Sequence, residues 1–596
     1  MSTPTEQATT WLSAFAAALD RADIGAAAAL FAEDCYWRDL VAFTWNIKTC
    51  EGKAEIADML QAVLAKVKPS GWKLVGEATE ANGVTEAWFS FETAAARGLG
   101  HVRLKDGKAW TLLTTAQELK GFEEKKGKRR WLGTEHGVHP DRKTWAEQKA
   151  EEEAALGLTR QPYVLIVGGG QGGIALGARL KRLGVPTIIV EKNDRPGDSW
   201  RKRYKSLCLH DPVWYDHLPF LPFPDDWPVF SPKDKMGDWL EAYTKIMELN
   251  YWTKTECKHA AYDAAKRAWT VEVVRDGKPI DLRPKHLVLA TGMSSVPVMP
   301  SYPGMQDFKG VQHHSSKHPG GEGWEGKKCI VIGSNNSAHD IAAALWEHGA
   351  DVTMIQRSTT HVSRSESLME VTTYPLWGED ALARGITCDK ADLIAASIPY
   401  RLLAEFQKPL YAEIRRRDAD FYDRLQKSGF MLDFGDDDSG LFMKYVRRGS
   451  GYYIDVGASE LIIEGKIKLK PGVNVERIKE HSVLFSDGSE LPADLIVYAT
   501  GYASMNGWAA QLISKEVADK VGKCWGLGSN TRKDPGPWEG ELRNMWKPTQ
   551  QEGLWFHGGN LHQSRHYSQF LSLQLKARME GVETPVYGLG KVHHTT

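Results

Sequence analysis

The chain has 596 residues, too many for a single hydrophobic core, which predicts two to four domains. Its 75 basic and 76 acidic residues give no electrostatic case for binding nucleic acid or an anionic membrane surface. No apolar run is long enough to span a bilayer, and the first residues lack the features of a signal peptide. The seven cysteines form no C-x-x-C pair and no metal-ligand spacing. We therefore expect a cytoplasmic protein without a metal site and without a nucleic-acid or membrane partner.

The first 130 residues predict a separate α+β domain. High helix propensity extends over residues 8–32, and a second helix is expected at about 53–67. Between residues 72 and 120, apolar and polar residues alternate around Asn-Gly and Asp-Gly turns, which predicts antiparallel hairpins. Helices followed by a curved sheet are typical of an independent α+β domain, here residues 1–130.

Two side chains of this domain, Asp39 and His101, could serve as acid and base groups in a pocket. We favour dimerisation or pocket shaping over an independent active site for the domain. The charge-rich segment 131–160 is expected to be a solvated helix and linker.

The strongest motif of the chain follows this linker. An apolar run of strand length leads into Gly168-x-Gly170-x-x-Gly173, and a predicted helix and a second strand ending at Glu191 come next. In such a unit the first glycine permits a tight turn, the second lets backbone N–H groups approach a pyrophosphate, and the third allows close helix–strand packing. Glu191 is placed to accept hydrogen bonds from ribose hydroxyls, and the helix N-terminus faces the phosphates. This unit is predicted to bind a dinucleotide.

A loop rich in polar and aromatic residues comes after Glu191. Gly197, Ser199 and Trp200 form a turn that could wrap a flavin ring system. His210, which precedes Asp211, could hydrogen-bond an oxygen species on the flavin, although an ordinary loop histidine is the alternative.

A second strand–turn–helix unit begins at Cys329. Its loop retains Gly333, but asparagine and alanine replace the later glycines, so it is a degenerate phosphate loop. Its second strand ends in Arg357 and Ser358 instead of an acidic residue. A carboxylate there would repel a 2′-phosphate, whereas a guanidinium can hold one bidentately. This unit is predicted to accept NADPH, and a surface arginine is the alternative.

The remaining segments complete two domains. We assign residues 161–310 together with 481–596 to the first nucleotide domain, and 311–480 to the second. The second contains a helical insertion at 366–460, whose aromatic residues could line a substrate pocket or belong to the core. A final helix, expected from about Tyr567 to Met579, could direct its positive N-terminal dipole at a reduced flavin.

Three connecting motifs accompany the two loops: Ala290-Thr291-Gly292, Phe308-x-Gly310-x-x-x-His314-x-x-x-His318, and Ala499-Thr500-Gly501-Tyr502. Together they resemble the class B flavoprotein monooxygenases, which include flavin-containing monooxygenases, plant YUCCA-type enzymes and Baeyer–Villiger monooxygenases. The resemblance covers about 160–596. The first domain is similar to the NTF2-like (SnoaL-like) cone, including the segment 29–39. That domain, and a histidine at 318 where the family usually has tryptophan, resemble the type II flavin-containing monooxygenases.

The resemblance implies an α/β fold with two dinucleotide-binding (Rossmann-like) domains preceded by an α+β NTF2-like cone. It implies FAD at the first loop and NADPH at the second, with NADH also possible because of His318, and O2 as cosubstrate. A C4a-(hydro)peroxyflavin would insert oxygen into a ketone or oxygenate a nitrogen or sulfur atom of a small hydrophobic substrate. We also expect the protein to be a homodimer. His314 and His318 would organise the hinge between domains.

Two other classes of flavoprotein share this domain pattern. An NADPH oxidase that only reduces O2, with the first domain as a binding or dimerisation module, stays open. A flavin disulfide reductase would need a redox cysteine pair, which the sequence lacks.

The predicted site residues fall into two groups. His210 and Asn560 are the predicted catalytic residues. The predicted cofactor-binding residues are Gly168, Gly170, Gln171, Gly173, Glu191, Lys192, Gly197, Ser199, Trp200, His210, Asp211, Thr291, Gly292, His314, His318, Gly333, Ser334, Asn335, Asn336, Ser337, Arg357, Ser358, Thr500 and Gly501.

Overall fold

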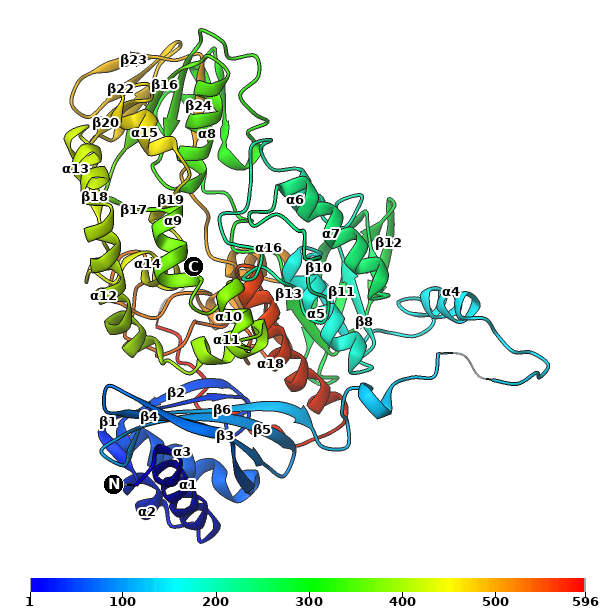
Figure 1. Cartoon of the computed structure of the whole chain (residues 1–596). Coiled ribbons are helices and arrows are strands. Elements are labelled where there is room, and N and C mark those ends of the chain that lie inside the picture. The colour runs from blue at the N-terminus through cyan, green and yellow to red at the C-terminus, as the bar shows by residue number, and fades with distance from the viewer. Residues whose placement is uncertain (1, 134–135, 594–596) are drawn as a thin grey trace.

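The computed structural model describes residues 2–133 and 136–593. It consists of an N-terminal domain, two α/β units and a helical insertion beside the second unit (Figure 1). Among the described residues, no helix combines the length and the apolar character needed to cross a bilayer.

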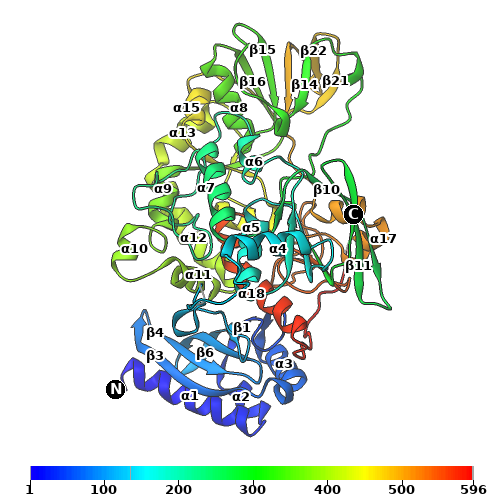
Figure 2. The same ribbon diagram turned by 90° about the vertical axis from the view of Figure 1, so that its right-hand side faces the viewer.

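The N-terminal domain is a six-stranded mixed sheet covered by three helices. The strand order is β2-β1-β6-β5-β4-β3, with β1 and β6 parallel and the other pairs antiparallel. The helices cover the face of the sheet that is turned away from the other units (Figure 2). Its elements are α1 (Pro4–Asp20), α2 (Ile24–Ala29), β1 (Phe31–Leu40), β2 (Ile47–Glu51), α3 (Gly52–Val67), β3 (Ser70–Ala81), β4 (Val84–Glu92), β5 (Ala96–Lys105) and β6 (Lys108–Leu119).

The hairpins and the second helix agree with the sequence, whereas the helix expected over 8–32 does not. Ala22 has a left-handed φ of 52°, which ends α1, and Asp23 caps a separate helix by accepting a hydrogen bond from the Ala26 N–H. Residue 31 already belongs to a strand, because Phe31 is fully buried in the sheet. Alanine-rich helix propensity was therefore overridden by tertiary packing at the end of this segment.

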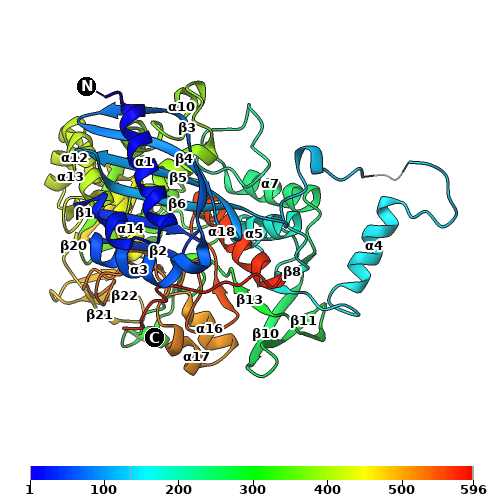
Figure 3. The same cartoon turned by 90° about the horizontal axis from the view of Figure 1, so that it is seen from below.

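The segment between the N-terminal domain and the first α/β unit forms an arm that projects from the body (Figure 3). It contains α4 (Trp145–Ala155), which has a Thr144 capping box and no buried residue. The expected solvated helix is present there. Residues 134 and 135 of the predicted linker lie outside the described residues.

The first α/β unit is a five-stranded parallel sheet in the order β25-β13-β7-β8-β9, with a three-stranded antiparallel sheet beside it. Its elements are β7 (Val164–Val167), α5 (Gln171–Arg182), β8 (Thr187–Val190), α6 (Asp198–Arg201), α7 (Lys233–Ile246), β9 (Tyr251–Trp252), β10 (Thr255–Asp263), β11 (Ala268–Arg275), β12 (Lys278–Leu282), β13 (His286–Leu289), α16 (Asn506–Leu512), α17 (Lys515–Val521), β25 (Leu554–Phe556) and α18 (Leu561–Met579). All four residues of both β7 and β8 are buried, as continuous apolar runs in a covered parallel sheet require.

The second α/β unit repeats this plan, with strand order β14-β24-β15-β16-β20. Its elements are β14 (Val311–His314), β15 (Lys328–Ile332), α8 (Asn336–Glu347), β16 (Asp351–Gln356), β20 (Lys468–Pro471), β21 (Val475–Ile478), β22 (Ser482–Phe485), β23 (Glu490–Pro492) and β24 (Leu495–Tyr498). Because β24 pairs with both β14 and β15, the chain returns to the first unit after Tyr498 and not at residue 481.

The helical insertion extends from β17 to α15 and lies between the second unit and the N-terminal domain (Figure 1). A small parallel sheet, β18-β17-β19, joins it to the second unit. Its elements are β17 (Thr360–Arg364), α9 (Ser365–Leu368), α10 (Glu379–Ala383), α11 (Cys388–Ala396), α12 (Tyr400–Arg417), α13 (Ala419–Lys427), β18 (Leu432–Asp433), α14 (Gly440–Arg448), β19 (Tyr452–Asp455) and α15 (Ala458–Ile463).

Helix α18 packs against α5 on one side and against β6 of the N-terminal domain on the other (Figure 1). It begins at Leu561, before the expected start at Tyr567. Asn560 caps it by accepting a hydrogen bond from the Gln563 N–H, and Gln563 bonds back to the Asn560 N–H. The polar first turn does not resemble a buried helix in the sequence, yet nearly all of it is buried.

Two neighbouring segments connect the α/β units. The outgoing segment contains Val298, whose N–H donates to the Gly501 carbonyl of the returning segment. The Thr500 hydroxyl donates to the Val298 carbonyl at 2.6 Å. The two crossings therefore lie side by side at the junction of the units.

Candidate functional site

A large cleft of about 1480 Å³ lies where the two units meet. Its wall includes both glycine loops, both crossing segments and residues of the helical insertion. The predicted site residues on the wall are Gly168, Gly170, Gln171, Glu191, Lys192, Ser199, Trp200, Thr291, Gly292, Gly333, Ser334, Asn335, Arg357, Ser358, Thr500, Gly501 and Asn560. Segments that are far apart in the sequence thus converge on one cavity.

The first glycine loop fits tightly between β7 and α5. Gly168 has a left-handed φ of 109°, and a Cβ atom on it would lie 2.4 Å from the Ala290 carbonyl oxygen. A Cβ on Gly173 would lie 2.0 Å from the Gly168 carbonyl oxygen, so Gly173 packs behind the loop and not on the wall. Helix α5 starts after Gly170 without a side-chain cap. Its first N–H groups are therefore available to an anion in the cleft.

Glu191, at the end of β8, supports this loop from the wall of the cleft. Its carboxylate accepts hydrogen bonds from the Gly169 N–H at 2.9 Å and from the backbone and side-chain N–H groups of Asn193 at 2.9 and 2.7 Å. A carboxylate can accept about four hydrogen bonds. Glu191 thus orders the loop and retains acceptor capacity for a ligand hydroxyl.

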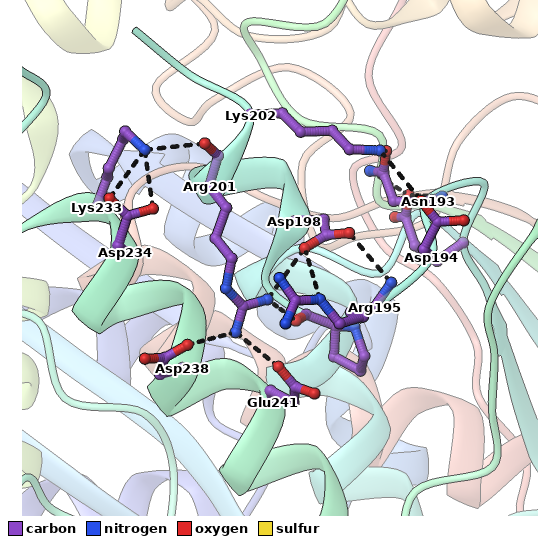
Figure 4. A network of polar contacts seen from close by, with 12 residues as sticks. Asn193, Asp194, Arg195, Asp198, Arg201, Lys202, Lys233, Asp234, Asp238 and Glu241 are labelled. Carbon is purple, nitrogen blue, oxygen red and sulfur yellow. Dashed lines mark hydrogen bonds and ion pairs between the residues drawn. The ribbon is translucent and has the colours of Figure 1, made fainter. Parts of the chain in front are cut away.

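The turn that carries Ser199 and Trp200 is held by a polar network (Figure 4). Arg201 donates to Asp198 at 3.1 Å and to Asp238 and Glu241 at 2.7 Å each, which ties α6 to α7. Gly197 lies behind the turn, because a Cβ on it would come within 2.1 Å of the Gly237 carbonyl oxygen.

The second glycine loop repeats the geometry of the first. Gly333 has a φ of 131°, and a Cβ on it would lie 2.4 Å from the Ala499 carbonyl oxygen. Helix α8 begins after Asn335, again without a side-chain cap. Asn336 instead accepts a hydrogen bond from the Ile454 N–H at 2.9 Å, and neither it nor Ser337 is on the cleft wall.

Cationic side chains gather on the wall near this second loop. Arg357, Arg532 and Lys533 line the cleft, and none of them has a carboxylate partner in the part of the chain that the structure describes. The pKa of Lys533 is lowered by burial and then by the charges of Arg448 and Arg357. A local excess of positive charge of this kind favours a polyanionic ligand. The sequence identified Arg357 alone, because Arg532 and Lys533 lie in an irregular segment far along the chain.

Besides Gly173, Gly197, Asn336 and Ser337, four more predicted residues lie away from the cleft wall: His210, Asp211, His314 and His318. His210 Nε2 is 3.6 Å from an oxygen of Asp340, and burial raises the pKa of the adjacent Asp211 to about 6. His314 Nε2 is 3.1 Å from the Gly501 carbonyl oxygen, so this histidine contacts the returning crossing. His318 Nδ1 is 3.1 Å from His313 Nε2, and burial lowers the pKa of His318 to about 4.

Asn560 lies on the wall, but its side chain is already engaged. Its Oδ1 caps α18, and its Nδ2 donates to the Tyr215 hydroxyl at 3.2 Å. The Tyr445 hydroxyl, which the sequence did not single out, accepts from the Asn560 N–H at 3.2 Å and donates to Gln563 at 2.6 Å. Burial raises the pKa of Tyr445 well above its usual value, so this hydroxyl stays protonated.

The two candidate acid–base groups of the N-terminal domain have structural partners. Asp39 accepts hydrogen bonds from the backbone of Phe43 and Thr44 and from the hydroxyls of Thr44 and Thr114. His101 Nε2 is 3.3 Å from Glu86, and burial lowers the pKa of His101 to about 4. Both groups are buried within the sheet.

Comparison with known proteins bears on both parts of the chain. The SnoaL-like domain family matches residues 12–112, and the family described as pyridine nucleotide-disulphide oxidoreductase matches residues 165–377. The indole-3-pyruvate monooxygenase YUCCA1 of Oryza sativa subsp. japonica is 32% identical over 365 residues, which cover 60% of this chain and 82% of that protein. The chain belongs to the flavin-containing monooxygenases. This confirms the class to which the sequence was assigned, and the SnoaL-like domain at its N-terminus.

Other relatives of this flavin-containing monooxygenase agree. The probable indole-3-pyruvate monooxygenase YUCCA1 of Arabidopsis thaliana is 31% identical over 343 residues, covering 57% of this chain and 75% of that one. An open crystal structure of cyclohexanone monooxygenase superposes with a TM-score of 0.50 at 18% identity, covering 70% of this chain and 88% of that chain. The last likeness is one of fold alone.

Proposed function

We propose that this monooxygenase binds FAD at the first glycine loop and NADPH at the second, and that it oxygenates small hydrophobic organic molecules. The observation that carries the proposal is that one cleft is lined by both glycine loops, each at the uncapped N-terminus of a helix. Two dinucleotides held in this way can approach each other within a single cavity.

The first loop fits FAD. The N-terminus of α5 would receive the pyrophosphate, Glu191 the ribose, and the turn with Ser199 and Trp200 the ring system. Bound FAD supplies hydride acceptance and the activation of O2, whereas the chain supplies binding, orientation and exclusion of water.

The second loop fits NADPH. The N-terminus of α8 would receive its pyrophosphate, and Arg357 with Lys533 would hold the 2′-phosphate. NADH lacks that phosphate and would lose these contacts, so we propose that NADPH is preferred and that NADH is used less efficiently.

The substrate is proposed to be a ketone or a compound with a soft nitrogen or sulfur atom. Support for a carbonyl compound comes from the relatives, whose names give indole-3-pyruvate, a 2-oxo acid, as their substrate. The rings of Tyr445, Trp508 and Trp525 on the cleft wall suit an apolar molecule.

Disulfide reduction is disfavoured by the cysteines on the wall. Cys257 and Cys524 line the cleft, but burial raises the pKa of the Cys257 thiol to about 12 and that of Cys524 well above its usual value. Both thiols therefore stay protonated, and only a thiolate attacks a disulfide.

The test is to add NADPH to the FAD-reconstituted protein without oxygen, and then to admit oxygen with a ketone or a thioether. We expect bleaching of the yellow flavin band and then an ester, lactone or sulfoxide. Persistent yellow colour would contradict the proposal. Peroxide equal to the NADPH consumed, with every substrate, would identify an oxidase instead.

A further inference from the structure

We propose that Arg38 of the N-terminal domain is a positioning residue for the active site, because it fixes the segment Gly558–Asn560 of the cleft wall through Tyr567 and Trp546. The N-terminal domain would then be a structural part of the active site as well as a neighbouring module. This inference rests on the proposed function, in that it takes the cleft to be the site of reaction.

The Arg38 side chain, on β1, reaches out of its own domain into three other segments. Its Nε and Nη2 donate to the two carboxylate oxygens of Glu541 at 2.7 and 2.9 Å. Nη2 also donates to the Tyr567 hydroxyl at 2.9 Å, and Nη1 to the Ala396 carbonyl oxygen at 2.9 Å. The Arg38 and Glu541 side chains are each 3% exposed. One desolvated guanidinium therefore joins β1, the Glu541 segment, α18 and the end of α11.

The contact with Tyr567 continues directly to the cleft. The Tyr567 ring stacks on Trp546, with ring centroids 3.9 Å apart and planes inclined by 6°. Trp546 Nε1 then donates to the Gly558 carbonyl oxygen at 3.0 Å. Gly558 lies on the cleft wall with a left-handed φ of 153°, a conformation that glycine adopts without steric cost. Arg38 thus determines where the Tyr567 ring lies, and this ring determines where Trp546 holds Gly558.

The contact with Ala396 reinforces the same helix from its other side. Ala396 ends α11, and one turn earlier Asp392 accepts two hydrogen bonds from Arg565 of α18 at 2.9 and 2.7 Å. Arg565 in turn donates to the Tyr215 carbonyl oxygen at 2.7 Å, and the Tyr215 hydroxyl accepts from Asn560. Helix α18 is therefore held on two sides, and its capped N-terminus lies at the cleft.

Because the Arg38–Glu541 ion pair is buried, its effect on the position of the cleft wall can be tested separately from its effect on the stability of the fold. Removal of Arg38 alone leaves the buried Glu541 carboxylate without its guanidinium partner, whereas replacement of both partners does not. We would compare Arg38→Met with the double variant Arg38→Met/Glu541→Gln, in which glutamine can still accept from the Thr49 hydroxyl that now donates to Glu541 at 2.7 Å. Arg97→Met is the matched control, since Arg97 lies on β5 with its side chain 45% exposed.

Three quantities would be measured on each variant: the melting temperature, hydrogen exchange of the peptide that covers 554–562, and peroxide formed per NADPH in the presence of substrate. We expect Arg38→Met to melt at a lower temperature and the double variant to recover most of that loss. In both variants the rate of hydrogen exchange in this peptide should rise about fivefold, because the loss of one hydrogen bond costs about 1 kcal/mol. The amount of peroxide formed per NADPH should also rise in both variants. Arg97→Met should match the parent protein.

The inference would be overturned if the double variant recovered normal exchange and normal peroxide yield together with its melting temperature. Arg38 would then only fasten two domains. The exchange measurement needs no cofactor turnover, so a parent protein that oxidised no NADPH would contradict the proposed function and leave this test standing.

Discussion

Arg357 provides the sharpest test of how the second loop selects its nucleotide. In Arg357→Gln a ligand phosphate would lose charge-assisted hydrogen bonds, which contribute about 1.5–3 kcal/mol when desolvated. Because Arg357 is exposed, solvent screens part of this energy, and we take about 1–2 kcal/mol. That corresponds to about a 5- to 30-fold increase in KM for NADPH.

The assay is steady-state oxidation of NADPH and of NADH by the same preparations. NADH has no 2′-phosphate, so its KM should be nearly unchanged, and the preference for NADPH should fall by the same factor. Arg477→Gln is the control, since Arg477 is an exposed arginine of the same unit that does not line the cleft. Equal increases in KM for both nucleotides would refute the reasoning, because Arg357 would then act on the shape of the loop and not on the phosphate.

The remaining predictions concern a glycine of the first loop, a buried carboxylate of the N-terminal domain and the dependence of stability on pH. Gly173→Ala should give a protein that retains little flavin, because its Cβ would lie 2.0 Å from the Gly168 carbonyl oxygen. The control is Gly25→Ala, whose Cβ would have one ordinary contact at 3.7 Å, and it should retain the flavin absorbance of the parent protein. Asp39→Asn should lower the melting temperature but preserve turnover, because one of the four donors to Asp39 would lose its acceptor, which reduces the free energy of unfolding by about 1–3 kcal/mol. Loss of turnover with little change in melting temperature would indicate a second active site. Stability should fall as the pH drops from about 6.5 towards 4, by up to about 1.4 kcal/mol per pH unit for each buried histidine, because burial depresses the folded-state pKa and only the unfolded chain takes up the proton. The histidines whose pKa burial lowers to about 3 or 4 are His101, His217, His286, His318, His339, His361, His557 and His566. Buried carboxyls with a raised pKa, such as Asp39, act in the opposite direction but are fewer, so a melting temperature that is flat from pH 6.5 to 5 would contradict this prediction.

The glycine loops could be predicted from the sequence because their backbone demands leave a direct trace in residue type. Gly168 and Gly333 both have left-handed φ values and lie against a carbonyl oxygen of a crossing segment. No other residue fits such a position, so the pattern of glycines records the geometry. The apolar strands on either side are similarly informative, since a parallel sheet covered on both faces requires continuous apolar runs.

Other parts of the site depend on contacts between distant segments. Lys533 reaches the second loop from an irregular segment without periodicity, and Tyr445 comes from an insertion in which aromatic residues are expected in any core. The buried first part of α18 contains Arg565, which pairs with Asp392 from 173 residues away. The direction of His210 towards Asp340 is likewise set by tertiary packing that no local pattern encodes.

Because the two crossing segments are adjacent, the second α/β unit could be exchanged between related proteins. The chain enters the second α/β unit and leaves it at neighbouring points, where Pro297 and Tyr502 form an antiparallel bridge. Joining the chain there would close only a short loop, which has a small entropic cost. We therefore expect that the second α/β unit with its insertion can be exchanged between relatives as one piece, with its two junctions at these bridged residues.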